Sequence, residues 1–288
     1  MQAWLIEPLS HPFMQRALIA ALLVGATCAV LSCFLVLKGW ALMGDAISHA
    51  VLPGIVLASA LSLPLAAGAF LAGLGCALSI GYVKENSRLK EDTAMGIVFS
   101  GLFATGLVLF TKLDTGQHLL HILFGNMLGV GWGDLAEIAL VALPTLALAI
   151  AKRRDLALYC FDPAHARVIG LNVRLLHFGL LALMALTVVA ALKAVGIILV
   201  VAMLIAPGAI GVLLARRFDT VLAIAMAAAL GSCLGGTFLS YRLDAATGPL
   251  IVLVQSALVA AALGFAAMRA RRGNRRSDPS AIPQQRFD

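Results

Sequence analysis

Long apolar stretches separated by short polar connections make up most of this chain. The stretches are about 18–22 residues long and lack the period-two alternation of a membrane β-strand. Helices of this length satisfy their backbone hydrogen bonds internally in lipid, so the pattern predicts an all-α, polytopic transmembrane protein. The predicted segments cover residues 18–37, 41–61, 65–83, 94–113, 135–151, 175–192, 195–215, 220–240 and 249–268.

The number of crossings depends on the second segment. Nine crossings place the N-terminus outside the cell, whereas a half-inserted second segment gives eight crossings and an N-terminus inside. Pro53-Gly54 is predicted to interrupt that segment and Pro207-Gly208 to kink the seventh, because proline removes a helical hydrogen bond. Residues 119–133 are glycine-rich and short, which predicts a short external or re-entrant helix.

Composition and charge agree with a membrane protein. Hydrophobic residues make up 61% and charged residues 12% of the 288 residues, and the mean hydropathy is +1.00. These values predict one transmembrane domain over residues 1–268, followed by a basic, disordered cytoplasmic tail over 269–288. The net charge of +7 lies largely in that tail, so it indicates topology and no nucleic-acid partner. The charged block at 84–92 and the basic blocks at 152–155 and 216–217 are likewise expected in the cytoplasm.

The cysteine pattern indicates packing residues. Cys28, Cys33, Cys76 and Cys233 lie in apolar segments, Cys160 lies in a polar connection, and no C-x-x-C occurs. We therefore expect neither disulfides nor a thiolate metal site.

Two ionisable side chains stand out in the second segment. Asp45 and His49 are four residues apart and share one face of a helix. Asp45 would lie about 10 Å inside the bilayer, where a charged group costs roughly 2.5–3.5 kcal/mol. Carboxylate and imidazole suit Mn(II), Fe(II) or Zn(II) and suit Cu(I) poorly. The alternative is a hydrogen-bonded pair that only joins two helices.

Other polar residues carry weaker indications. His118 and His121 flank an external turn and are expected to be interfacial, while His165 and His177 suit solvated or capping roles. Ser48 cannot pair with its sequence neighbour His49 on a helix, and G-x-S-x-G and H-E-x-x-H are absent, which argues against an intramembrane enzyme. No phosphate-binding P-loop occurs either, so ATP-driven transport would need a separate subunit. A gradient-driven secondary metal transporter is the alternative.

The longest polar connection, residues 155–174, contains signals for a short helix. Asp162 can cap the helix, Pro163 can occupy its first position, and Gly170 can end it. A two-turn helix is therefore expected in the cytoplasm.

The sequence resembles a known family along most of its length. The stretch from Gly39 to Gly54, including ALMGDAISHAVLP, closely resembles the signature of the membrane permeases of manganese/zinc/iron ABC importers. Further resemblances cover residues 85–96, 121–126, 160–173, 200–208 and 247–253. Gln117-His118 departs from the family, in which an acidic residue is commoner at this point.

The resemblance implies a multi-pass protein of the inner (cytoplasmic) membrane that imports manganese or iron, or less favourably zinc. Its implied partners are a second permease copy or paralogue, two cytoplasmic ATP-binding subunits and an extracytoplasmic metal-binding protein. Asp45 and His49 would handle the metal. The implied contact with the ATPase is the helix that includes Asp162, Pro163, Ala164, His165, Ala166, Gly170 and Leu171.

Overall fold

The computed structural model describes residues 11–113 and 127–274, and every regular element in those ranges is helical. This confirms the predicted all-α class. The elements are α2 (Pro12–Lys38), α3 (Ala41–Ala60), α4 (Leu65–Asn86), α5 (Glu91–Lys112), η1 (Met127–Gly129), α7 (Trp132–Ala151), α8 (Arg153–Phe161), α9 (Pro163–Val168), α10 (Val173–Leu214), α11 (Phe218–Leu243) and α12 (Thr247–Asn274).

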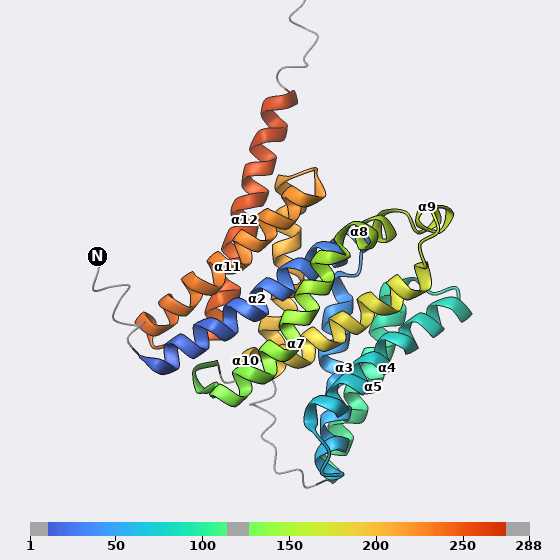
Figure 1. Ribbon diagram of the computed structural model, residues 1–288, viewed down its shortest axis with the longest axis vertical. Coiled ribbons are helices and arrows are strands. Elements are labelled where there is room, and N and C mark those ends of the chain that lie inside the picture. The colour runs from blue at the N-terminus through green and yellow to red at the C-terminus, as the bar shows by residue number, and fades with distance from the viewer. Residues whose placement is uncertain (1–10, 114–126, 275–288) are drawn as a thin grey trace, which may run out of the picture.

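Helix α2 lies against α10 and α11, while α3, α4 and α5 form a second group in contact with α10 (Figure 1). The core face of α2 is rich in small residues, which allow close helix packing. At Gly25, for example, an added Cβ atom would lie 2.8 Å from the Cys233 sulfur of α11. Glycine at this position lets the two helices approach.

The two ends of the bundle differ in charge. The His11 ring lies 6.1 Å from Tyr241, so α2 starts where α11 ends. At the opposite end, Arg153 forms a 3.3 Å ion pair with Asp219, near the basic block at 216–217. In the described residues, eight segments are long and apolar enough to cross a membrane, and a shorter apolar helix covers Leu199–Leu214. This arrangement favours nine segments, with the N-terminus opposite the basic end.

Helix α3 is continuous, so the predicted interruption at Pro53-Gly54 is wrong. The neighbouring helices explain why the segment tolerates proline. A Cβ atom at Gly106 of α5 would lie 2.8 Å from the Pro53 ring, and one at Gly54 would collide with the Gly68 carbonyl of α4. Close packing on both sides therefore holds α3 helical although Pro53 cannot donate to the His49 carbonyl.

Helix α10 contains both of the segments predicted at 175–192 and 195–215. Its backbone leaves helical geometry at Gly196, with φ 73° and ψ 169°, close to the predicted boundary. The helix continues through Pro207. There the Ser32 hydroxyl of α2 accepts a 2.8 Å hydrogen bond from the Gly208 N–H and donates to the Ile205 carbonyl at 3.1 Å. A buried serine thus ties α2 to the proline region of α10.

The helix α8 was not predicted. Its buried residues, Leu156, Tyr159 and Cys160, follow the i, i+3, i+4 spacing of a short amphipathic helix. Burial raises the pKa of the Cys160 thiol to about 12, although nearby Lys38 lowers it. This agrees with a packing role for the cysteine.

Some predictions concern residues that lie outside the described ranges. These are His118, His121, most of the 119–133 stretch and the tail from residue 275 onward. The helix α12 continues beyond residue 268, the predicted domain boundary, to Asn274.

Candidate metal site

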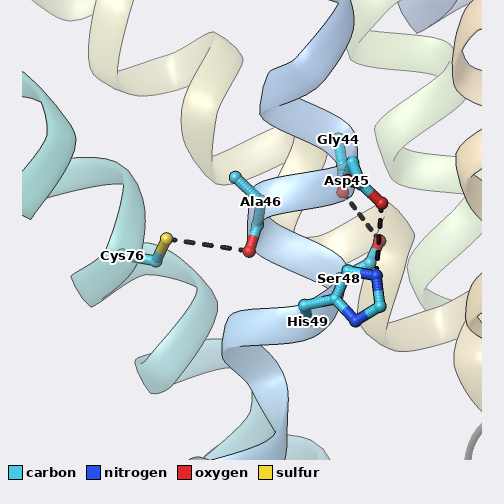
Figure 2. Close-up of polar contacts among 6 residues, drawn as sticks. All are labelled: Gly44, Asp45, Ala46, Ser48, His49 and Cys76. Atoms are coloured by element: carbon cyan, nitrogen blue, oxygen red, sulfur yellow. Dashed lines mark hydrogen bonds and ion pairs between the residues drawn. The ribbon is translucent and has the colours of Figure 1, made fainter. Parts of the chain in front are cut away.

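Asp45 and His49 lie together on one face of α3, as their spacing predicts. The His49 Nε2 is 3.3 Å from an Asp45 carboxylate oxygen (Figure 2). The side chains are 28% exposed for His49 and 34% for Asp45, so the pair faces the outside of the single chain. Both residues can therefore meet a ligand or a partner without any change in α3.

The separation of the two atoms fits ligands of one metal ion. In a tetrahedral site with bonds of about 2.0–2.1 Å, neighbouring ligand atoms are roughly 3.3 Å apart. The pair could thus hold a divalent ion between the carboxylate and the imidazole without rearrangement of the helix.

Aromatic side chains from α5 position the imidazole. The His49 ring lies 5.2 Å from Phe103, edge to face, and 5.9 Å from Phe99. Its Nδ1 is buried and has no hydrogen-bond partner among the described atoms. The two phenylalanines restrict the ring, while the Nε2 edge remains directed toward Asp45.

The neighbouring candidates have other roles. The buried Ser48 hydroxyl donates to the Gly44 carbonyl of its own helix at 2.7 Å. The Cys76 thiol of α4 lies 3.8 Å from the Ala46 carbonyl, away from the Asp45–His49 pair (Figure 2). Neither residue reaches the pair, which agrees with the expectation that Ser48 is no nucleophile and Cys76 is a packing residue.

One chain supplies an incomplete site. Within residues 11–113 and 127–274, no three His, Cys, Asp or Glu side chains come close enough to hold a metal. Leu42 is 50% and Leu57 45% exposed on the same side of α3 as the pair. An outward apolar stripe thus borders two potential ligands.

The short helix α9 has the predicted boundaries. The Asp162 carboxylate accepts hydrogen bonds from the N–H groups of Ala164, at 3.0 Å, and His165, at 2.9 Å. Gly170 has φ +88°, and the Leu171 N–H donates to the Ala166 carbonyl at 3.0 Å. This is a Schellman end, with glycine in its left-handed position.

Apolar side chains around α9 project outward. Val168 is 83%, Phe161 67% and Ile169 54% exposed, whereas Ala166 is buried. Pro163, at the first helical position, is half-buried. A cluster of exposed large apolar residues at the two ends of so short a helix is typical of an interaction surface.

Sequence reasoning missed a cluster that connects this region to α3. The Tyr159 hydroxyl lies 2.8 Å from the His177 Nδ1, and the Lys38 ammonium lies 4.3 Å from the centre of the Tyr159 ring. His177 also packs edge to face against Trp40, the residue that precedes α3, at 5.3 Å. The residues come from distant parts of the chain, so spacing alone gave no signal for their contact.

The permease arrangement seen here recurs in known proteins. The model of the ABC 3 transport family matches residues 10–266. The chain belongs to this family. As an ABC 3 permease it is a multi-pass membrane protein of an ABC transporter, which confirms the family resemblance and removes the gradient-driven alternative.

Relatives of this ABC 3 permease are similar over almost their full length. The chelated iron transport system membrane protein YfeD of Yersinia pestis is 60% identical over 89% of this chain and 86% of that protein. The manganese transport system membrane protein MntB of Synechocystis sp. is 51% identical, over 90% and 85%. The structure of PsaBC from Streptococcus pneumoniae in complex with Fab matches with a TM-score of 0.82 and 37% identity, over 91% and 95%.

Proposed function

We propose that this permease carries manganese or iron ions across the inner membrane into the cytoplasm, with Asp45 and His49 as metal ligands on the path. The observation that carries the proposal is the 3.3 Å approach of a carboxylate oxygen and an imidazole nitrogen on the outer face of α3. The names of the relatives, which refer to iron and manganese, support the choice of ion. Zinc would fit the same ligands, but those relatives favour it less.

A second permease subunit completes the site in this proposal. Two ligands bind an ion weakly, and the outward position of the pair leaves room for ligands from a facing chain. A permeation site should also be weak enough to release its ion. The second subunit is a copy of this chain or a paralogue.

Energy for transport comes from cytoplasmic ATP-binding subunits that dock on α9. The exposed Phe161, Val168 and Ile169 supply the apolar contact, while Asp162 and Gly170 fix the ends of the helix. Ala164, His165, Ala166, Pro163 and Leu171 complete this coupling segment. An extracytoplasmic metal-binding protein delivers the ion at the opposite end.

Metal uptake by cells that carry single variants tests the site. Asp45→Asn and His49→Ala should each abolish manganese and iron uptake, because each removes one of the two ligands that the chain supplies. Membrane insertion and copurification of the ATP-binding subunit should remain normal, since both side chains are part-exposed and outside α9.

Ser48→Ala is the matched control. It lies on the same helix between the two ligands, and its hydroxyl bonds only to the backbone of α3, so uptake should stay near the wild-type rate. Wild-type uptake by both Asp45→Asn and His49→Ala at equal expression would refute the proposed site.

A further inference from the structure

Helices α10, α11 and α12 pack against one another (Figure 1), and two cavities adjoin between them at the basic end of the bundle. One cavity, of about 680 Å³, is lined by Arg216, Arg217, Thr220 and Arg269 together with apolar residues from the end of α10 and from α12. The other, of about 690 Å³, is almost entirely apolar. Leu214 lines both, so the two cavities form one continuous groove.

The basic cavity suits a phosphate group. Three arginines line it, two from the connection between α10 and α11 and one from α12, and no carboxylate is among the described residues that line the cavity. Asp219, the nearest acid in sequence, is engaged with Arg153 at 3.3 Å. Guanidinium groups bind phosphate oxygens through paired hydrogen bonds, and Thr220 adds a hydroxyl donor.

The apolar cavity runs from the basic cavity toward the middle of the membrane. Its walls include Ile210 from α10, Ile224 from α11, and Leu258 and Phe265 from α12. Gly231 of α11 also lines it, and a Cβ atom added there would meet nothing within 4 Å. The glycine thus leaves open space along this cavity, here called the apolar slot.

We propose that this groove binds an anionic phospholipid of the cytoplasmic leaflet, with its phosphate on Arg216, Arg217 and Arg269 and an acyl chain along Gly231 and Phe265. Basic pockets between membrane helices at the cytoplasmic side have the charge to hold such headgroups. The bound lipid would contact both the end of α10 and α12, which line the basic cavity from two sides.

Charge argues against the chain's own tail as the occupant. Residues 275–288 contain Arg275, Arg276 and Arg286 against Asp278 and Asp288. With three arginines against two aspartates, the segment has no net negative charge with which to bind a cavity lined with three more arginines. A free phosphate would fill the basic cavity alone and leave the apolar slot without a ligand.

Native mass spectrometry of the purified full-length protein tests the proposal. Phosphatidylglycerol and phosphatidylcholine of identical acyl chains are added separately, with inorganic phosphate as a third probe. We expect phosphatidylglycerol to be retained preferentially and inorganic phosphate not to displace it. The triple variant Arg216→Gln, Arg217→Gln, Arg269→Gln should weaken its binding about tenfold or more, and Gly231→Leu should do so by filling the slot.

Two control variants separate the groove from general effects. Arg154→Gln removes an exposed arginine at the same end of the molecule, and Gly264→Leu fills an open glycine position of α12 outside the groove. Both should bind phosphatidylglycerol as the wild type does. Should the triple variant fail to fold, Arg269→Gln alone should still lower the retention.

Three results would overturn the proposal. These are equal retention of the two lipids by the wild type, unchanged binding in both the arginine and Gly231→Leu variants, and full displacement by inorganic phosphate. The last result would assign the arginines to a free anion.

Discussion

A carboxylate in an apolar helix is stable only where something offsets its removal from water. Asp45 meets this condition through its 3.3 Å contact with His49, and its position on the outer face of α3 leaves room for a further partner. The phenylalanines of α5 restrict the imidazole, so the pair is held ready for a cation. A carboxylate and an imidazole are common side chains. At the scale of single residues, what distinguishes this pair is that both lie on the same outer face of α3, within 3.3 Å of each other.

Cys160 provides a second prediction at this scale. Burial raises the pKa of the Cys160 thiol to about 12, so the thiol stays protonated at pH 7–8. The same burial makes it inaccessible to solvent. In a chain without other cysteines, maleimide should label Cys160 on the order of a hundredfold more slowly than a cysteine introduced by Val168→Cys, which is 83% exposed. Equal labelling rates would show that α8 does not pack as described.

The same burial gives a direction to the pH dependence of stability. Between the ordinary thiol pKa of 9.0 and about 12, the unfolded chain releases a proton that the folded chain retains. The contribution of Cys160 to stability is therefore complete below pH 9 and is lost as the pH rises toward 12. Cys160→Ala should show a shallower loss over that range.

Individual residues differed in how well the sequence predicted them. Asp45 and His49 were predictable because a charge in an apolar stretch is conspicuous and a four-residue spacing places both on one face. The contact of Tyr159 with His177 could not be predicted, because its prediction requires knowledge of how α8 packs on α10.

At the scale of elements, glycine contacts decide where α3 lies. Gly54 of α3 and Gly68 of α4 approach so closely that a Cβ atom on either would collide with the backbone of the other. Gly44 similarly faces Leu204 of α10, with an added Cβ atom 3.0 Å from that side chain. The helix that carries the proposed metal ligands is thus held by close contacts with α4 and α10.

Gly54→Leu should separate α3 from α4. Overpacking typically costs about 1–3 kcal/mol, and a collision with backbone should lie at or above the upper end of that range. The thermal midpoint in detergent should fall clearly, and metal uptake should fall with it. Gly75→Leu on α4, where an added Cβ atom meets open space, should leave both unchanged, and a similar loss in the two variants would contradict the packing argument.

Ala164→Glu tests the coupling helix α9. Ala164 is exposed and sits in the first turn, where an acidic residue is compatible with the helix dipole, so folding should be unaffected. The new charge should weaken copurification of the ATP-binding subunit or uncouple ATP hydrolysis from transport. Ala246→Glu, an exposed alanine in the connection between α11 and α12, is the control; normal ATPase binding and metal-stimulated hydrolysis in Ala164→Glu would place the contact elsewhere.

Elements were predicted where local signals agree with packing. The ends of α9 followed from Asp162, Pro163 and Gly170, because caps are set by neighbouring residues. The interruption at Pro53-Gly54 was wrong because contacts with α4 and α5 override a local preference. Helix α8 was missed because its short buried stripe lies within a polar connection.

For the whole molecule, the outward direction of Asp45 and His49 fits the facing subunit proposed above. Leu42 and Leu57 flank the pair on the same exposed side of α3 and would pack in that interface. The apolar length of the segments was readable from sequence. The helix that faces a partner could not be identified from the sequence, because every membrane-facing surface is apolar.

A photo-crosslinking amino acid at position 42 tests this arrangement. In membranes it should link α3 to a second permease chain, whose identity is given by the mass of the product. The same amino acid at position 140, where Leu140 is 75% exposed on α7, should give no such product. Crosslinking to a permease only from position 140 would place the interface on α7 and leave the metal site without a second set of ligands.

The helix from Leu199 to Leu214 is shorter than its neighbours. At about 1.5 Å per residue it spans about 24 Å, less than the roughly 30 Å of a typical hydrocarbon core. The bilayer must therefore thin beside it, or the arginines that follow it must be drawn toward the hydrocarbon. Because thicker membranes increase that mismatch, the thickness of the host bilayer is expected to affect how well this segment is accommodated.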